Sequence, residues 1–219
     1  MYLARHRRKR PGRGSLGVAL AAAALCAGGL GAAMFGLADV TTASAGATLT
    51  PASVTTAVPA QRHDPRARAL ARSAPVRIRI PAIGVSAPVM RLGRNADGSV
   101  QVPPLGEHNL AGWYAYGPAP GQRGAAVILG HVDSLTGISV FFHLKDLRAG
   151  DRIYVTLADG AVAAFAVDGV QKVAKTAFPT AVVYAKARYP ELRMITCGGP
   201  FDAASGHYLD NIIVYAHLV

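Results

Sequence analysis

The sequence predicts a mainly β domain of many short strands, and three observations support this fold class. Val76–Ile80 alternates apolar and basic residues, as a half-buried strand does. Short apolar runs with the same texture recur to the end of the chain. Turn signals such as Asn95–Gly98 and Asp159–Gly160 separate these runs at regular spacing. This texture indicates an antiparallel barrel or sandwich, and periodicity alone does not distinguish the two.

The expected elements follow from these signals in chain order. The first strand, Val76–Ile80, ends at Pro81, and the hairpin-type turn Asn95–Gly98 leads into a strand at Ser99–Val102. Leu105–Gly124 is rich in Gly and Pro and is predicted to be irregular. A short helix is predicted at Phe141–Leu147, and further strands at Ala125–Leu129, Arg152–Leu157, Ala161–Gln171, Leu192–Thr196 and Ile212–His217.

An apolar segment without charge, Leu16–Ala38, predicts a transmembrane helix ahead of this domain. At 1.5 Å per residue its 23 residues are long enough to cross a bilayer core. Basic residues precede it and Asp39 follows it, so the N-terminus is expected in the cytoplasm and the domain outside. The alternative is a cleaved signal peptide, because Ala43–Ala45 resembles a signal-peptidase site, although the apolar region exceeds the usual signal-peptide core.

Length and composition then divide the chain into four parts. A length of 219 residues allows one domain with appendages. Residues 1–15 form a basic cytoplasmic tail and residues 16–38 the membrane anchor. Residues 39–75 are mostly Ala, Thr, Pro, Ser and Arg, which predicts a flexible linker that cannot bury a core. Residues 76–219 form the folded domain.

The net charge of +11 does not indicate nucleic-acid binding. Six of the 23 basic residues stand before the apolar segment, and the remaining 17 face 12 acidic residues, an ordinary balance. No basic patch interleaved with aromatic residues is present to stack bases. The N-terminal positive charge therefore points to the membrane as partner.

Cys197 and His131 are the candidate catalytic residues. Each stands at the end of a short apolar run, Leu192–Thr196 and Ala125–Gly130, as a thiol nucleophile and its proton-transfer partner require. The other cysteine, Cys26, lies in the predicted membrane segment, so no intrachain disulfide is available. An unpaired thiol in an exported domain favours a reactive role over the alternative of a buried core cysteine.

The sequence around these two residues resembles that of the sortase family, most closely the class F sortases of actinobacteria. The resemblance covers Val76 to Val219 and is carried by Pro81–Val85, Gly130–Ser134, Phe141–Leu144, Leu147–Asp151 and Ile195–Gly199. It implies a closed β-barrel and a membrane-anchored extracellular cysteine transpeptidase.

The resemblance also implies the reaction and its partners. The enzyme would cleave a Leu-Pro-x-Thr-Gly-like sorting signal of substrate proteins through an acyl-thioester on Cys197. It would then pass the acyl group to an amine of cell-wall peptidoglycan, with His131 moving the protons. Two alternatives remain: a thiol peptidase in which water resolves the thioester, and a degenerate sortase-like module that binds without turnover.

The chain departs from the family at one site residue. Sortases carry an arginine at or just before the last strand, which steadies the oxyanion or the substrate, and no arginine follows Arg193 here. Asn211 and a protonated His207 are the nearest substitutes. A distant arginine such as Arg123 or Arg188 is a third possibility, and backbone amides alone a fourth, since Gly198–Gly199 opens the backbone beyond the thiol.

The sequence gives weaker indications of a role for the other polar and aromatic residues. Asp133 either orients the His131 imidazole or is an exposed turn carboxylate. Trp113, Tyr114 and Tyr116 either line a peptide groove or pack the core. His108, His143 and His217 are expected to be surface or packing residues. No metal site and no cofactor are predicted, because the exported part has one cysteine and no His pair with ligand spacing.

Overall fold

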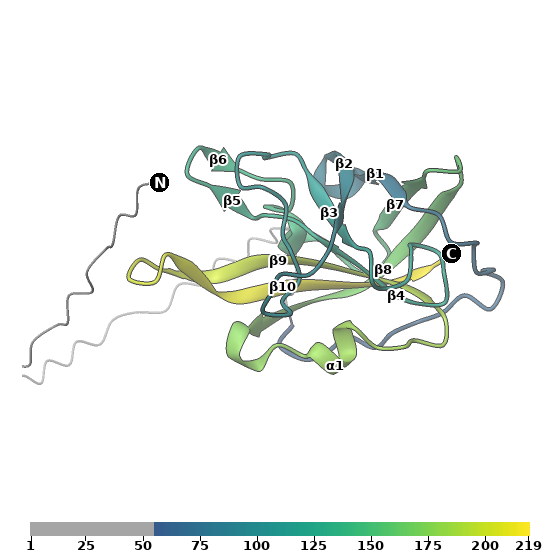
Figure 1. Ribbon diagram of the computed structural model, residues 1–219. Coiled ribbons are helices and arrows are strands. Elements are labelled where there is room, and N and C mark those ends of the chain that lie inside the picture. The colour runs from purple at the N-terminus through teal and green to yellow at the C-terminus, as the bar shows by residue number, and fades with distance from the viewer. Residues whose placement is uncertain (1–54) are drawn as a thin grey trace, which may run out of the picture. The chain divides into compact units, whose positions relative to one another are not determined.

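Eight strands close into a barrel in the computed structural model, which describes residues 55–219 (Figure 1). Their spatial order is β1-β2-β3-β4-β9-β10-β8-β7, and β7 pairs back with β1. The strands of the barrel are β1 (Pro75–Ile80), β2 (Val85–Leu92), β3 (Ala111–Tyr114), β4 (Gly124–Leu129), β7 (Arg152–Leu157), β8 (Val162–Ala174), β9 (Pro190–Asp202) and β10 (His207–Leu218).

Short elements fill the connections of the barrel. A separate two-stranded sheet consists of β5 (Asp133–Ser134) and β6 (Gly137–Ile138). One-turn 3-10 helices are η1 (Pro81–Ile83), η2 (Leu144–Asp146) and η3 (Lys175–Ala177), and α1 (Thr180–Val183) is a single α-helical turn. The long β9–β10 hairpin projects beyond the barrel at the end where β5 and β6 lie (Figure 1).

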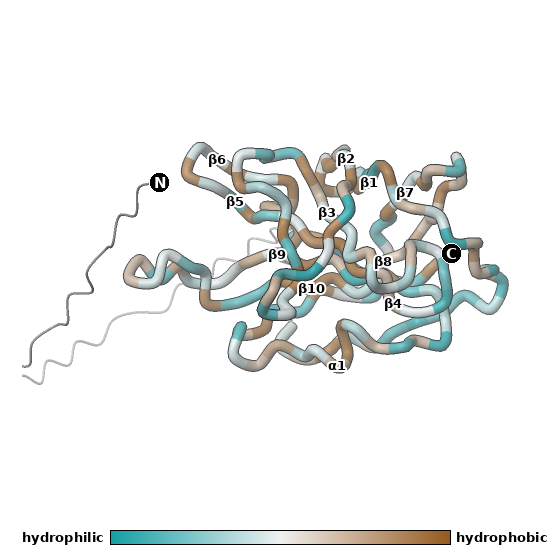
Figure 2. Tube along the Cα trace, viewed as in Figure 1, coloured by the Kyte–Doolittle hydropathy of each residue, from teal (hydrophilic) through white to brown (hydrophobic). Residues whose placement is uncertain are grey.

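Alternation along the strands places one apolar set inside the barrel. Leu192 and Met194 of β9 are fully buried there with Val214 of β10, and all three belong to one core cluster. Figure 2 shows the hydrophobic colour along the strands and more hydrophilic colour in many of the loops. This period of two is the sequence signal that the strand predictions used.

A second, smaller cluster covers part of the outer face of the same strands. It joins Val127 of β4, Ile195 of β9 and Ile213 of β10 to Val183 of α1. The β8–β9 connection therefore packs on the outside of the barrel, over β4, β9 and β10. Residues of β9 are buried on both faces along much of the strand, which makes its outer face a sheltered surface rather than an exposed one.

The barrel is mixed rather than antiparallel, which corrects the sequence prediction. β2 runs parallel to β3, and β4 runs parallel to β9 from the pair Gly124↔Pro190 to the pair Leu129↔Ile195. The other pairs in the barrel are antiparallel. A strand's own pattern does not state its partner, so the sequence could not supply this pairing.

Most of the predicted strands are confirmed, with β9 and β10 longer than expected, and η2 confirms the short helix near Phe141–Leu147. Ser99–Val102 is wrong as a strand, because only the isolated bridge Arg94↔Val100 follows the turn. The prediction missed β2 and β3. Pro88 interrupts the pattern of β2, and β3 shows no alternation because all four of its residues are buried.

The flexible-linker prediction is wrong for residues 55–74, which lie against the barrel. Thr55 forms a bridge with Gln171, and the Leu70 amide donates to the Gly121 carbonyl at 2.8 Å. These partners are far away in sequence, so composition could not reveal the contacts.

Gln61, in the same segment, completes a buried ion-pair cluster on the outer face of β9. The Arg193 side chain is fully buried, pairs with Glu191 and stacks over Tyr215. Gln61 Oε1 accepts a hydrogen bond from Arg193 Nη2 at 2.8 Å. A buried charge is costly unless hydrogen bonds satisfy it, so this contact ties the segment to the fold.

The predicted tail (1–15), the predicted anchor (Leu16–Ala38) and the first part of the linker lie outside the described residues. Within residues 55–219 no helix is long and apolar enough to cross a membrane.

Candidate active site

Cys197 lies on the outer face of β9, near the end of the barrel from which the β9–β10 hairpin projects. It is a free, partly exposed thiol. Along β9 it follows Ile195 on the outer face, whereas Met194 points into the core. The thiol therefore stands at the point where a sheltered strand face becomes accessible.

His131 and Cys197 follow the same end of the β4–β9 pairing, because these two strands are parallel. Their last paired residues are Leu129 and Ile195, and the Gly130 amide donates to the Ile195 carbonyl at 3.1 Å. β4 ends at Leu129, and His131 and Cys197 each come two residues after this last pair. The register thus brings the two predicted catalytic residues to the same end of two adjacent strands.

A backbone carbonyl contacts one nitrogen of the His131 ring. His131 Nε2 lies 2.6 Å from the carbonyl oxygen of Pro103. A carbonyl only accepts, so Nε2 carries a proton and donates it in this contact. The loop that follows β2 thus reaches the imidazole, although it is about 28 residues away in sequence.

Asn211 is the residue directly opposite Cys197 on β10. Directly opposed residues share a face, with Cβ atoms about 4.5–5.5 Å apart, so the Asn211 and Cys197 side chains start from the same face of the sheet. His207 pairs with Asp202, four residues nearer to the hairpin tip, about 13 Å along the strand.

The two distant arginines are at the wrong end of the barrel. Arg123 precedes β4 and Arg188 precedes β9, and the adjoining residues Gly124 and Pro190 are paired with each other. Seven residues of strand separate Pro190 from Cys197, about 23 Å. Asn211 is therefore the predicted oxyanion candidate whose position fits.

The backbone beyond the thiol bends at Gly199. Its φ of +74° is in the left-handed region, and the Asp210 carboxylate lies where a Cβ would be. The β9–β10 register shifts between Tyr208 and Asp210, so a bulge accompanies the bend. A side chain at Gly199 would be excluded on both grounds, which explains the glycine at this position.

Asp133 has a partner other than His131. Its carboxylate accepts a short hydrogen bond from the hydroxyl of Tyr208, and no hydrogen bond joins it to the His131 ring in the described part of the chain. No direct hydrogen bond between Asp133 and His131 therefore supports the predicted orienting role of Asp133. The bond instead links the turn after His131 to the β9–β10 hairpin.

This hydrogen bond raises the pKa of Tyr208 to about 12. The hydrogen bond to Asp133 is the largest cause, followed by burial and by repulsion from the negative forms of Asp133 and Cys197. The pKa of Tyr208 thus depends on Asp133 after β4 and on Cys197 of β9. Neither Tyr208 nor Pro103 carried a sequence signal, because one is a single aromatic residue in a turn-rich stretch and the other acts through its backbone.

The remaining candidates divide between packing and surface. Trp113 is a core residue whose Nε1 donates to the Pro118 carbonyl at 2.9 Å, whereas Tyr116 is exposed. The His143 ring pairs with Asp146, and the His217 ring pairs with Asp168. Among residues 55–219 no group of three or more His, Cys, Asp or Glu side chains is arranged to hold a metal ion.

The arrangement suits acyl transfer. It combines a partly exposed free thiol on β9, an imidazole just after the end of the adjacent strand β4, and an Asn residue paired with the cysteine on β10. Together these groups can attack a carbonyl, move a proton to a leaving amine and donate a hydrogen bond to an oxyanion.

Comparison with known proteins identifies the family and the fold. A family model described as a sortase domain matches residues 78–219. Sortase A from Corynebacterium diphtheriae, solved as a lid mutant, is 25% identical with a TM-score of 0.51, and the match covers 68% of this chain and 72% of that one.

Two further solved structures share the fold. Sortase C-1 from Actinomyces oris is 23% identical with a TM-score of 0.51, over 65% of this chain and 72% of that one. Sortase C1 from Streptococcus agalactiae is 18% identical with a TM-score of 0.51, over 69% and 71%. No curated protein sequence matches the chain.

The Tyr208–Asp133 bond predicts a testable titration. Tyr208→Phe should remove one phenol that ionises near pH 12 from the ultraviolet titration of the wild-type protein. Asp133→Asn should lower the pKa of that phenol toward the ordinary value of 10.0. Because the folded-state pKa is raised, the stability that the bond supplies is complete below pH 10 and is lost as pH rises through about 12.

The matched control for this titration is Asp202→Asn, which changes an acid of the same hairpin that accepts from the Ala204 amide and not from the Tyr208 hydroxyl. An Asp133→Asn protein with the wild-type titration would contradict the assigned cause of the shift.

Proposed function

Because the chain belongs to the sortase family, whose members are cysteine transpeptidases, we propose that it is a membrane-anchored extracellular transpeptidase with Cys197 as nucleophile. The observation that supports this proposal is the parallel register of β4 and β9, whose last pair, Leu129↔Ile195, comes two residues before His131 and Cys197. The proposed substrates are proteins with a Leu-Pro-x-Thr-Gly-like signal, and the proposed acceptor is an amine of cell-wall peptidoglycan. The class F-like assignment belongs to the same proposal and rests on the sequence motifs.

The reaction proceeds in two halves. The Cys197 thiol passes its proton to His131, and the sulfur attacks the carbonyl carbon of the scissile peptide bond. His131 then gives that proton to the nitrogen as the C–N bond breaks. The product of this half is a thioester on Cys197 and a free amine. An acceptor amine then attacks the thioester carbon, passes a proton to His131, and the Cys197 thiolate leaves as the new amide forms.

Asn211 is proposed to stabilise the oxyanion of both tetrahedral intermediates. The pairing of Asn211 with Cys197 across β9 and β10 supports this role. The sortase resemblance implies an arginine nearby in sequence, and Asn211 would act in its place. A neutral amide donates one hydrogen bond without a positive charge, so it offers weaker stabilisation than a guanidinium. If water replaces the amine in the second half, the same residues give a thiol peptidase, which is the second candidate function.

The first prediction for this mechanism concerns the nucleophile. Cys197→Ala should abolish both cleavage of a fluorogenic sorting-signal peptide and transfer to an added amine, because the acyl-thioester cannot form. Mass spectrometry of products with and without amine separates transfer from hydrolysis. Transfer that persists in a pure Cys197→Ala protein would overturn the mechanism, and a folded wild-type protein without turnover would favour the binding-module alternative.

The second prediction concerns Asn211. Asn211→Ala should lower turnover by about 10²-fold or more through loss of one oxyanion donor, while alkylation of Cys197 and thermal stability stay near wild type. His207→Gln is the matched control, because it removes a polar side chain of the same strand about 13 Å away and should leave turnover and its pH dependence near wild type. Unchanged turnover in Asn211→Ala would remove Asn211 from the site.

The third prediction concerns localisation. If Leu16–Ala38 anchors the protein, the cellular protein should keep its N-terminus, stay with membranes after a high-salt wash and expose residues 55–219 to protease outside the cell. N-terminal sequencing measures the first point directly. A mature form that begins near Gly46 and is released into the medium would instead support the signal-peptide alternative.

A further inference from the structure

The backbone ladder of the barrel ends before it reaches His131. β4 ends at Leu129, so its pairing with β9 does not by itself fix the distance between the imidazole and the thiol. His131 begins a short hairpin, residues 131–141, which includes β5 and β6. Cys197 stands at the base of an arm, residues 198–210, which projects beyond the barrel as the tip of the β9–β10 hairpin (Figure 1). The distance therefore depends on how the His131 hairpin meets this arm.

The His131 hairpin is closed and fixed at its base. The Phe141 amide donates to the His131 carbonyl at 3.0 Å, and the Ser139 amide donates to the Val132 carbonyl at 3.0 Å. The Phe141 side chain is fully buried, and a Cβ added to Gly130 would lie 2.6 Å from its ring. Core packing thus holds the base of the hairpin, and the hairpin moves as one unit.

One side of the hairpin is held by His108, in the loop after β2. Nε2 of His108 lies 2.7 Å from the Thr136 hydroxyl, and Nδ1 lies 3.3 Å from the Ser134 hydroxyl. The backbone carbonyl of His108 accepts from the Val140 amide at 2.7 Å. This side of the hairpin is therefore attached to the loop by both side-chain and backbone contacts.

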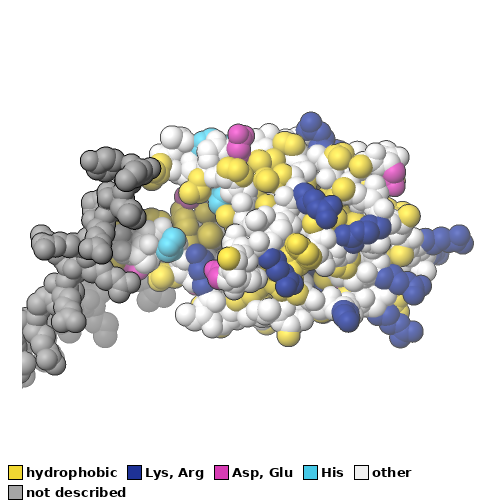
Figure 3. Space-filling view, viewed as in Figure 1, with side chains coloured by type: hydrophobic (Ala, Val, Ile, Leu, Met, Phe, Trp, Pro, Cys, Tyr) yellow, Lys and Arg dark blue, Asp and Glu magenta, His cyan; other side chains and the backbone are white. Residues whose placement is uncertain are grey.

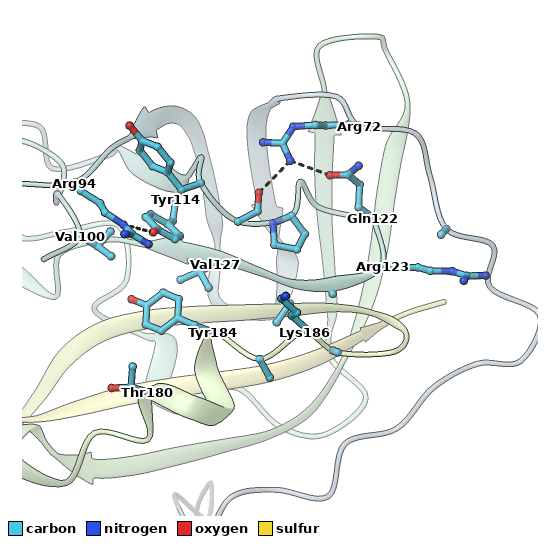
Figure 4. A pocket seen from close by; sticks show the side chains of 18 of the residues that line it. Arg72, Arg94, Val100, Tyr114, Gln122, Arg123, Val127, Thr180, Tyr184 and Lys186 are labelled. Carbon is cyan, nitrogen blue, oxygen red and sulfur yellow. Dashed lines mark hydrogen bonds between the residues drawn. The ribbon is translucent and has the colours of Figure 1, made fainter. Parts of the chain in front are cut away.

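The loop after β2 is in turn attached to the barrel. Its Arg94 Nε donates to the Tyr114 hydroxyl of β3 at 2.5 Å, and the guanidinium stacks over Tyr114 and Tyr116 (Figure 4). The same loop places the Pro103 carbonyl 2.6 Å from His131 Nε2. These contacts hold the imidazole relative to β3, but none of them involves β9 or the arm that follows Cys197.

The contact with the arm is the hydrogen bond from the Tyr208 hydroxyl to the Asp133 carboxylate. Tyr208 is opposite Phe201 in the arm, and the two rings meet edge to face at 5.2 Å. In the described part of the chain no other hydrogen bond joins the His131 hairpin to the arm. This bond therefore connects the segment that carries the imidazole to the segment that follows the thiol.

The charges around the bond favour it. Neither the hairpin nor the arm contains a Lys or Arg residue, and Figure 3 shows most of these side chains over the half of the molecule away from the arm. The Asp133 carboxylate thus meets a phenol instead of a cation. The pKa of Tyr208, raised to about 12 mainly by this bond, keeps the phenol protonated as the donor at neutral pH. A hydrogen bond to a charged acceptor is roughly twice as strong as one between neutral groups.

We propose that Asp133 and Tyr208 are positioning residues, whose hydrogen bond holds the His131 hairpin against the arm and so sets the distance from the imidazole to the thiol. Neither residue touches the reacting atoms. This inference rests on the proposed function, because it takes Cys197 as the nucleophile and His131 as its proton-transfer partner. A displacement of about 1 Å between reacting groups can lower a rate by about 10²-fold, so one hydrogen bond at this place can control turnover.

The test compares two substrates that differ in how much they need His131. One is a sorting-signal peptide with its scissile amide, and the other is the same peptide with a thioester at that bond. The amide nitrogen needs a proton to leave, whereas the thioester sulfur leaves as a thiolate without one. A displaced imidazole therefore slows cleavage of the amide more than cleavage of the thioester. The full-length protein in detergent is used, and mass spectrometry of the products gives kcat and KM for both substrates.

Tyr208→Phe should lower kcat for the amide by about tenfold to hundredfold and should lower the ratio of amide to thioester kcat by about tenfold. KM should stay within about twofold of the wild-type value, because substrate binding is not changed. Asp133→Ala should have the same effect. The double variant should be no slower than the slower single variant, since both substitutions remove the same bond.

The matched control is Tyr215→Phe, which removes a phenol of the same strand that donates to Gln171 at 2.7 Å, away from the His131 hairpin. It should leave the ratio of the two kcat values at the wild-type value, even where its thermal stability falls. Thermal unfolding of every variant is measured alongside the kinetics.

The results distinguish this inference from the proposed function. A Tyr208→Phe protein with wild-type kcat, or one that loses the same factor on both substrates, overturns the positioning role. A fall of the ratio in Tyr215→Phe as large as in Tyr208→Phe does so as well. Losses that multiply in the double variant show that the two residues act separately and overturn the pair. A wild-type protein that cleaves neither substrate contradicts the proposed function, and the inference falls with it.

Discussion

The parallel pairing of β4 and β9 is the constraint on which the site depends. Six paired positions lock the two strands in register, and a closed barrel leaves neither strand free to slip. A shift by one residue would turn His131 or Cys197 to the opposite face. The same pairing also keeps Arg123 and Arg188 far from Cys197, because these arginines precede the paired strands at their other end. Catalytic geometry here is thus a consequence of backbone hydrogen bonds and of core packing, more than of contacts between the catalytic side chains themselves.

The outer face of the barrel joins parts of the chain that are distant in sequence. Tyr208 of the β9–β10 hairpin donates to Asp133 in the turn after His131. The loop after β2 contacts the His131 ring through the Pro103 carbonyl, and its Arg94 donates to the Tyr114 hydroxyl of β3. One loop therefore contacts both the imidazole and a strand that pairs with β4.

The absent arginine changes the electrostatics of the site more than its geometry. A guanidinium opposite the thiol would bring a permanent positive charge, whereas Asn211 brings only a dipole. The Asp210 carboxylate, on the same strand as Asn211, adds negative charge and packs against Gly199. Arg72, Arg94, Arg123 and Lys186 line a cleft whose lining includes neither Cys197 nor His131. These four cations therefore do not replace the family's arginine at the thiol.

The sequence by itself determined the strand-rich fold class, most strand positions, the sortase resemblance and the two catalytic candidates. These features depend on alternation and on short motifs, which are patterns of residues close together in the chain. The sequence also offered four alternatives for the missing arginine, but it did not show which of them lies near Cys197. Only the tertiary structure decided that β4 and β9 are parallel, that Asn211 faces Cys197 and that Asp133 pairs with Tyr208. It also revealed that residues 55–74 pack on the barrel and that four scattered cations share one cleft. Each of these facts joins residues that are distant along the chain, and pairing between distant segments depends on the whole barrel closing rather than on any local pattern.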